Sequence, residues 1–364
     1  MMSRRLFGLA ALVALVPLIL LAAMWGGLIR IGWPWPVLSP TLIISHGALM
    51  IAGVLGTLIS LERAVALKAA WTFAPPVLSG LGAVAMILWA TEGPGLLLIT
   101  MGSLALVGVF AFIVRQHRAP YTVTMALGSV AWAVGNVLWL AGQPLSVAVL
   151  WWVAFLVLTI AGERLELSRV LRLTPARTRA FGLTIAVLLI GLIVAVVAFD
   201  VGMRLTGLGY VMLAAWLGLN DIARRTIKGA GLTRYIAACL LVGYAWLGIG
   251  GVFALVYGGV RSGPPYDAIL HSILLGFVFS MILGHAPIIA PALLRIAIPY
   301  DRSLYAPLVL LSLSLALRMT GDVLEAWDVR RWGGLLNALV LLLFLGNLIR
   351  LARRGNAPRP RLET

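Results

Sequence analysis

Residues 180–199 of the chain read AFGLTIAVLLIGLIVAVVAF and contain no charged side chain. A helix that spans a membrane needs roughly 20 consecutive apolar residues, and only helices or closed barrels satisfy their backbone hydrogen bonds inside lipid. The run lacks the alternation of apolar and polar residues that marks a barrel strand. It therefore predicts a transmembrane helix.

Runs of the same kind recur along the whole chain. Hydrophobic residues make up 62% of the sequence and charged residues 11%, where a soluble domain usually has about 25% charged residues. We expect an all-α fold, a polytopic transmembrane helix bundle with about twelve spans in a single domain over residues 1–352, and a short disordered tail over residues 353–364. The expected spans are 6–29, 39–62, 75–92, 96–114, 121–141, 145–167, 180–199, 205–222, 234–258, 267–291, 303–320 and 333–350.

The 28 basic residues give a formal net charge of +16. No basic helix or aromatic stacking motif accompanies them, so nucleic-acid binding is not expected. Most of them lie in loops on the side of the N-terminus, which predicts cytoplasmic N- and C-termini in a bacterial-type inner (plasma) membrane. The basic residues expected on the opposite, outer side are Arg30, Arg204, Arg261, Arg318, Arg330 and Arg331.

The cysteine count limits the kinds of site that the chain can form, and the length of the N-terminal apolar run decides between a signal peptide and a span. The single cysteine, Cys239, excludes an internal disulfide and a cysteine-ligated iron–sulfur cluster. The N-terminus begins like a signal peptide, but its apolar run, Leu6 to about Ile29, is too long and has no obvious small-residue cleavage site. We interpret it as the first span.

Three of the four histidines fall inside predicted spans, where ionisable side chains are costly and usually functional. His46 lies about seven residues into the second span and His271 about four residues into the tenth, and both spans run from outside to inside. At roughly 1.5 Å of rise per residue the two rings share one depth. Such a pair suits axial haem ligation or a shared metal site. The alternative is that each ring hydrogen-bonds a neighbouring helix as structural glue.

His285 follows His271 by fourteen residues. Fourteen steps of roughly 100° return to within about 40° of the same helix face, about 21 Å deeper. Cytochrome-b-type helices hold two stacked haems with a similar spacing, but fourteen residues after His46 stands Ser60. The sequence therefore supports at most a two-ligand site and a second site with the single ligand His285. Pro287 predicts a kink beside His285 because it removes a backbone hydrogen bond.

Charged pairs mark several span ends. Glu62-Arg63 ends the second span, and Glu163-Arg164 ends the sixth. The repeated Glu-Arg step indicates either a duplicated half of the protein or two interfacial salt bridges, and we favour the salt bridges. Arg318 and Asp322 are spaced for an i,i+4 ion pair at the outer end of the eleventh span. Alternatively, Arg318 holds the propionates of a haem bound near His46 and His271. Six tryptophans are expected in the interfacial belts: Trp33, Trp35, Trp151, Trp152, Trp327 and Trp332.

Two segments carry a resemblance to a known family: His46-Gly-Ala-Leu-Met-Ile-Ala-Gly-Val-Leu-Gly-Thr-Leu-Ile-Ser-Leu-Glu-Arg63, and His271-Ser-Ile-Leu-Leu-Gly-Phe-Val-Phe-Ser-Met-Ile-Leu-Gly-His-Ala-Pro287. With the twelve spans, they resemble the NnrS-type membrane proteins. The resemblance implies a haem- and copper-containing protein of nitric oxide metabolism, with His46 and His271 as ligands and His285 as a further one. The chain lacks the His-x-His start associated with that family, which argues against copper more than against haem.

We therefore expect a haem- or metal-binding inner-membrane protein linked to nitric oxide or respiratory redox chemistry of the denitrification type. Its partners would be the lipid bilayer and a diatomic gas ligand or redox partner. Two alternatives stay open. A secondary transporter would explain twelve spans, although the midplane lacks acidic residues for coupling ions. A non-catalytic membrane subunit of a respiratory complex is the other. Neither the substrate, nor the oligomeric state, nor whether the chain is an enzyme follows from the sequence.

Overall fold

The structure is a computed structural model that describes residues 2–89, 93–294 and 296–356, with side chains from residue 12 onward. Within these residues the chain forms helices and no strands. Twelve described segments are long and apolar enough to cross a membrane. The predicted all-α polytopic bundle is therefore confirmed.

The first half of the chain forms α1 (Met2–Arg30), α2 (Pro40–Ala48), η1 (Leu49–Leu55), α3 (Gly56–Leu67), η2 (Ala70–Phe73), α4 (Ala74–Trp89), α5 (Gly95–Gln116), α6 (Pro120–Leu140), α7 (Leu145–Ser168) and η4 (Arg169–Leu171). The second span consists of α2, η1 and α3. The second half forms α8 (Pro175–Val197), α9 (Phe199–Asn220), α10 (Ala223–Thr226), α11 (Gly231–Tyr257), α12 (Gly263–His271), η5 (Ser272–Phe279), α13 (Ser280–Leu294), η6 (Arg302–Leu304), α14 (Tyr305–Val323) and α15 (Trp327–Gly355). The tenth span consists of α12, η5 and α13.

Several spans begin where proline and a capping residue meet. Pro40 opens α2, and the Ser39 hydroxyl before it accepts a hydrogen bond from the backbone N–H of Thr41. Pro175 opens α8 in the same way, after the cap Thr174. The first turn of a helix has N–H groups without intrahelical partners, so proline costs nothing there and a hydroxyl cap satisfies one of them.

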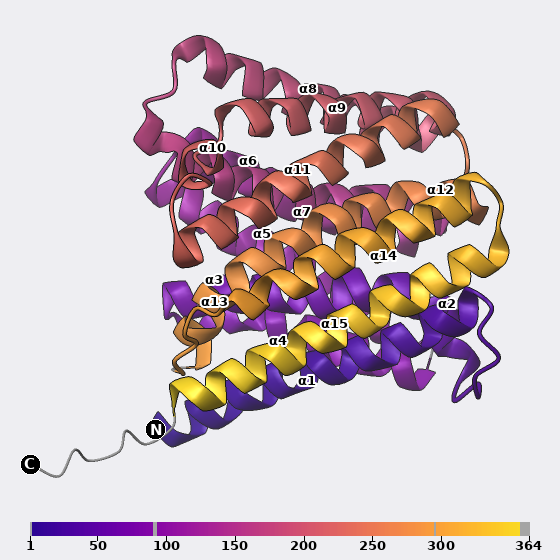
Figure 1. Cartoon of the computed structure of the whole chain (residues 1–364), viewed down its shortest axis with the longest axis horizontal. Helices are drawn as coiled ribbons and strands as arrows, with labels where there is room; N and C mark the ends of the chain where they lie inside the picture. The colour runs from indigo at the N-terminus through magenta and orange to yellow at the C-terminus, as the bar shows by residue number, and fades with distance from the viewer. Residues whose placement is uncertain (1, 90–92, 295, 357–364) are drawn as a thin grey trace, which may run out of the picture.

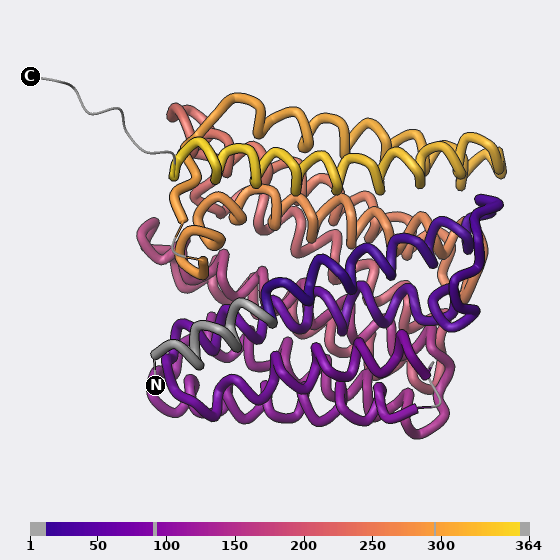
Figure 2. The backbone as a smooth tube through the Cα atoms, turned by 90° about the horizontal axis from the view of Figure 1, so that it is seen from below, coloured from indigo at the N-terminus to yellow at the C-terminus, as the bar shows by residue number. Residues whose placement is uncertain are grey.

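The long helices run roughly parallel or antiparallel to one another across the molecule (Figure 1). α1 and α15 run in opposite directions, so they carry the two chain ends to the same side. We call this the inner side and the opposite one the outer side, following the distribution of basic residues. Figure 2 shows the same bundle from below, that is, from the side on which α1 and α15 lie in Figure 1.

α7 is the central helix of the bundle. In its most apolar stretch 89% of the residues are buried inside the protein, compared with 28% for α15 at the border. Trp151 and Trp152 lie on α7 and are 8% and 0% exposed, so their assignment to an interfacial belt was wrong. A helix surrounded by other helices on all sides has no lipid-facing tryptophans. Trp327 and Trp332 are exposed, as expected for a belt.

Two spans depart from regular α-helical geometry in the same way. The second span changes to a π-helix over Leu49–Leu55 (η1), and the tenth over Ser272–Phe279 (η5). Each π segment begins one to three residues after a histidine, His46 or His271. π-helical turns are rare and often mark functional sites. Pro287 lies within α13, downstream of η5.

The outer end of the last two spans differs from expectation. The expected spans 303–320 and 333–350 leave residues 321–332 as a loop, but α14 continues to Val323 and α15 already starts at Trp327. Arg330 and Arg331 are thus helical residues with fixed neighbours. At the other end α15 continues to Gly355, while residues 357–364 of the expected tail lie outside the described residues.

Candidate functional site: a histidine pair in an apolar slot

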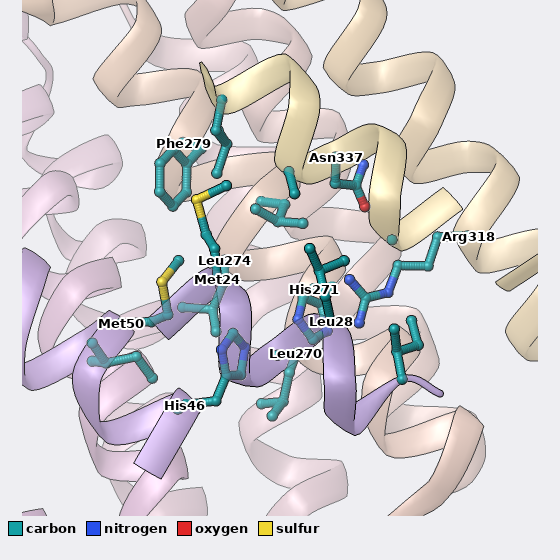
Figure 3. A pocket seen from close by; sticks show the side chains of 18 of the residues that line it. Met24, Leu28, His46, Met50, Leu270, His271, Leu274, Phe279, Arg318 and Asn337 are labelled. Atoms are coloured by element: carbon teal, nitrogen blue, oxygen red, sulfur yellow. The ribbon is translucent and has the colours of Figure 1, made fainter. Parts of the chain in front are cut away.

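A narrow slot opens in the outer half of the bundle between α1, the second span, α7, the tenth span, α14 and α15. His46, His271, Arg318 and Asn337 are its polar lining residues, and the rest of the wall is apolar or glycine. Figure 3 shows the rings of His46 and His271 entering the slot from different helices, with Arg318 beside His271. The structure thus brings together the two histidines that the sequence paired by depth.

His46 is held by the first helix. Its Nδ1 lies 2.7 Å from the carbonyl oxygen of Ala23 on α1. Because a carbonyl can only accept, Nδ1 carries the proton and Nε2 keeps its lone pair. A Cβ on Gly27 would lie 2.6 Å from the ring, so only glycine leaves room for the imidazole at this point of α1.

His271 is held by a carboxylate of its own helix. Its Nδ1 lies 3.1 Å from the carbonyl oxygen of Asp267 and 3.2 Å from Oδ1 of the same residue. Nδ1 therefore donates to Asp267, and Nε2 is again left with its lone pair. Metal-binding histidines usually donate their other ring nitrogen to a carboxylate or carbonyl in this way, which fixes the ring and raises the basicity of the ligating nitrogen.

Asp267 is the centre of a buried ion-pair network. Arg318 donates to its two carboxylate oxygens from Nε at 2.7 Å and from Nη2 at 2.8 Å. Arg330 approaches Oδ1 to 3.4 Å and forms a shorter, 2.7 Å pair with Asp322. The expected Arg318–Asp322 pair was therefore wrong. α12 packs against α14 and places Asp267 in front of the Arg318 fork, where a bidentate pair is possible.

Asp267 and Arg330 were not identified from the sequence. Asp267 stands four residues before His271, the i,i+4 spacing that places two side chains on one helix face. This spacing was the available signal. Arg330 was counted only among the basic residues of the outer side, between two expected spans, so its contacts with Asp267 and Asp322 were not expected.

His285 lies away from the slot and is not among its lining residues. Its Nδ1 is 2.7 Å from the carbonyl oxygen of Met281, one turn earlier in the same helix. The charged groups that act on it are those of the inner side, namely Arg164, Glu62 and Asp221. Among the described residues no group of three or more His, Cys, Asp or Glu side chains is arranged to hold a metal ion. His285 is thus not brought to the other two histidines.

The charged steps at the inner ends form ion pairs between spans. Arg63 pairs with Glu163 across two spans and lies 3.6 Å from its neighbour Glu62. Arg164 donates to both oxygens of Asp221, at 2.9 Å and 3.0 Å. Both steps therefore take part in salt bridges, as favoured from the sequence, but Glu163 and Arg164 pair with Arg63 and Asp221 on other segments rather than with each other.

The size of the slot limits what it can hold. Its cavity volume is about 130 Å³, whereas pockets for drug-sized ligands enclose roughly 300–1,000 Å³. A Cβ on the lining residue Gly47 would meet nothing within 4 Å. Two imidazoles, apolar walls and an arginine supply the groups that a haem with two axial histidines and charged propionates needs, but the walls of the slot would have to move apart to admit it.

The chain was compared with curated proteins and with models of protein families. The comparison with curated proteins gives no match. A family model, in contrast, matches nearly the whole length of the described bundle. By that match, over residues 8–353, the chain belongs to the family described as Domain of unknown function (DUF8744).

Proposed function

We propose that this chain is a haem-binding protein of a bacterial-type inner membrane, with His46 and His271 as the ligands of the haem iron. The bound group would bind nitric oxide or a similar diatomic molecule, or relay electrons to it. One observation carries the proposal. Both Nδ1 atoms are committed to Ala23 and Asp267, so both Nε2 lone pairs remain for a ligand in one slot.

The protein's part in this function is to hold and shield the group. Ala23 and Asp267 fix the two ring orientations, and the apolar wall keeps water out. Arg318 gives Nε and Nη2 to Asp267, while Nη1 lies on the slot side, 3.7 Å from the position that a Cβ on Gly334 would take. That N–H group is placed to neutralise a propionate carboxylate. A haem supplies gas affinity and redox chemistry when bound.

The resemblance to NnrS-type proteins supports the same ligand pair and the link to nitric oxide. It rests on the segments that begin at His46 and His271. In the structure these are the two spans that change to π-helix directly after their histidines, and both contribute to the slot.

The proposal is tested by purifying the protein in detergent from haem-replete cells. Absorption spectra and haem, iron and copper contents are then measured for the wild type and the His46→Ala and His271→Ala variants. We expect a Soret band with sharp reduced bands in the wild type and loss of haem or a changed ligand spectrum in both variants. A wild type without haem, or two variants with an unchanged band, would refute the proposal.

His285→Ala is the matched control. This histidine is also half-buried and lies on the tenth span, but it lies outside the slot. Its spectrum should equal that of the wild type. Addition of nitric oxide to the reduced wild-type protein then tests the second half of the proposal. A shifted Soret band supports gas binding, and an unchanged one leaves electron relay as the role of the haem.

Copper is the second candidate for the slot. The thioethers of Met24 and Met50 line it together with the two histidines, and thioether and imidazole ligands suit copper. The same metal analysis distinguishes the two, because a copper site would give stoichiometric copper without a Soret band.

The transporter and the assembly-subunit alternatives have less support. No carboxylate belongs to the slot lining, so this cavity offers no acidic side chain for a coupling cation. Uptake driven by an ion gradient in proteoliposomes would nevertheless favour a transporter. Stoichiometric copurification of respiratory subunits would favour the third alternative.

A further inference from the structure

A second cavity lies at the inner end of the bundle, far along the chain from the histidine slot. It forms where α7 with η4 ends, α8 begins and α9 leads into α10. Its volume is about 310 Å³. Arg177, Arg224 and Arg225 line it, together with Asp221 and Leu219. None of these residues lines the histidine slot.

The charge of this arginine cavity is positive because its one acidic lining residue is already neutralised. Both carboxylate oxygens of Asp221 accept from Arg164, and the carboxylate also accepts from the Ser168 hydroxyl at 3.4 Å and from the backbone N–H of Ala223 at 2.7 Å. Arg164 and Asp221 are both buried. The three arginines at the cavity thus keep their charge uncompensated by Asp221.

Among the three arginines, the contacts in the described part of the chain leave most guanidinium N–H groups available. Arg224 donates from Nη1 to the carbonyl oxygen of Leu219 at 3.0 Å. The carbonyl oxygen of Arg177 accepts from the indole N–H of Trp216 at 2.9 Å, which fixes the backbone at the start of α8. Within the described part of the chain no salt bridge involves Arg177 or Arg225. Guanidinium groups in such an arrangement match the oxygens of a phosphate.

The surroundings of the cavity are apolar and exposed. Leu219, itself a lining residue, is 64% exposed, and Leu167 and Val170 on the neighbouring chain segment are 51% and 66% exposed. A ligand here would meet the three arginines and the apolar lining residues Leu171 and Leu219 in one cavity. That combination matches a phospholipid, which has a charged headgroup and apolar acyl chains.

We propose that the arginine cavity binds the phosphate headgroup of an anionic phospholipid from the inner leaflet. Basic pockets between transmembrane helices on the cytoplasmic side are suited to such headgroups. The shared chemistry is that of a phosphate anion, and the exposed Leu219, Leu167 and Val170 favour lipid over free phosphate as its source. The site is independent of the haem proposal and stays valid if that proposal fails.

The test measures retention of phosphatidylglycerol and cardiolipin by the purified full-length protein in a neutral detergent, using native mass spectrometry. The wild type is compared with an Arg177→Gln/Arg224→Gln/Arg225→Gln variant and with a charge-matched control, Arg115→Gln/Arg118→Gln/Arg353→Gln. We expect the cavity variant to bind these lipids on the order of 100-fold more weakly, and the control to bind like the wild type. Equal binding by all three proteins would overturn the proposal.

Two further arms keep the proposal decidable. Inorganic phosphate and phosphatidylcholine are offered separately, and binding of phosphate at millimolar concentration without any lipid would overturn the lipid assignment. Should the triple variant fail to fold, the Arg225→Gln variant is used, because this exposed guanidinium makes no hydrogen bond to the described protein. It should weaken retention several-fold, and unchanged retention would again contradict the site.

Discussion

The two histidine-bearing spans are built alike but hold their histidines differently. Each starts as an α-helix, presents a histidine to the slot and then changes to a π-helix. His46 is fixed by a backbone carbonyl of a neighbouring helix, whereas His271 contacts both the backbone carbonyl and the carboxylate of Asp267 on its own helix, and that carboxylate is itself bound by Arg318. If the proposed haem is bound, His46 would be a ligand with neutral support and His271 a ligand whose basicity is raised by a charged neighbour.

The largest effect is expected from removing the charged support of the second histidine. Asp267→Ala should lower the free energy of unfolding by about 3–5 kcal/mol, because it leaves the buried Arg318 and Arg330 without their shared carboxylate. Thermal or denaturant unfolding in detergent measures this. Asp328→Ala is the control, since Asp328 pairs with Arg331 at the surface and is 84% exposed. It should change stability by less than about 1 kcal/mol. Equal losses in the two variants would contradict the network.

A smaller effect is expected at the first histidine, whose support is steric. Gly27→Ala places a Cβ 2.6 Å from the His46 ring and should cost about 1–3 kcal/mol of stability while displacing the ligand. Haem content and the ligand spectrum report the displacement. Gly47→Ala lies on the same slot, but its Cβ meets nothing within 4 Å. If both variants keep the wild-type spectrum, Gly27 does not position His46.

Asp267→Asn tests the charge without deleting the side chain. The amide keeps a hydrogen-bond acceptor for His271 but removes the negative charge, so His271 becomes the weaker ligand and the reduced iron is favoured. We expect a higher midpoint potential and roughly 10- to 100-fold weaker retention of the group. Redox titration followed by absorption is the measurement. A potential equal to that of the wild type would mean that the two histidines are equivalent after all.

The smallest effect is expected from a substitution at the position four residues after a histidine. Met50 follows His46 at this offset, and Leu275 follows His271. Met50→Leu therefore makes the first span resemble the second, at a cost below about 1.5 kcal/mol because the volume is nearly conserved. Haem content should stay at the wild-type level. A selective loss of bound copper would instead identify the thioether as a ligand.

The sequence predicted the parts of the fold that depend on composition and regular geometry. Uncharged runs such as residues 180–199 gave the spans, and the positions of His46 and His271 within their runs gave the shared depth. Both inferences need only helix rise and the cost of burying polar groups in lipid. That these two histidines bind a group together stays a prediction.

The features that the sequence did not predict depend on tertiary contacts. The π segments have no residue signature, and wider i→i+5 turns advance by a smaller angle per residue than an α-helix. His285 was expected about 21 Å deeper than His271, so its place outside the slot agrees with helix rise. Only its helix face, calculated at 100° per residue across η5, is affected by the π segment. The partner of Arg318 likewise depends on helix packing. Asp322 lies one turn away on the same helix, but Asp267 on another helix is the residue that Arg318 binds, and Asp322 pairs with Arg330.

The hydrogen bond from His46 to Ala23 gives α1 a role that its leader-like sequence conceals. This helix supplies the acceptor that selects the tautomer of His46, and its Gly27 supplies the space for the ring. A truncated protein that starts after Arg30 would lose one wall of the slot and release one of its two imidazoles. Any study of shortened or fused forms of this protein therefore has to keep the first helix in place.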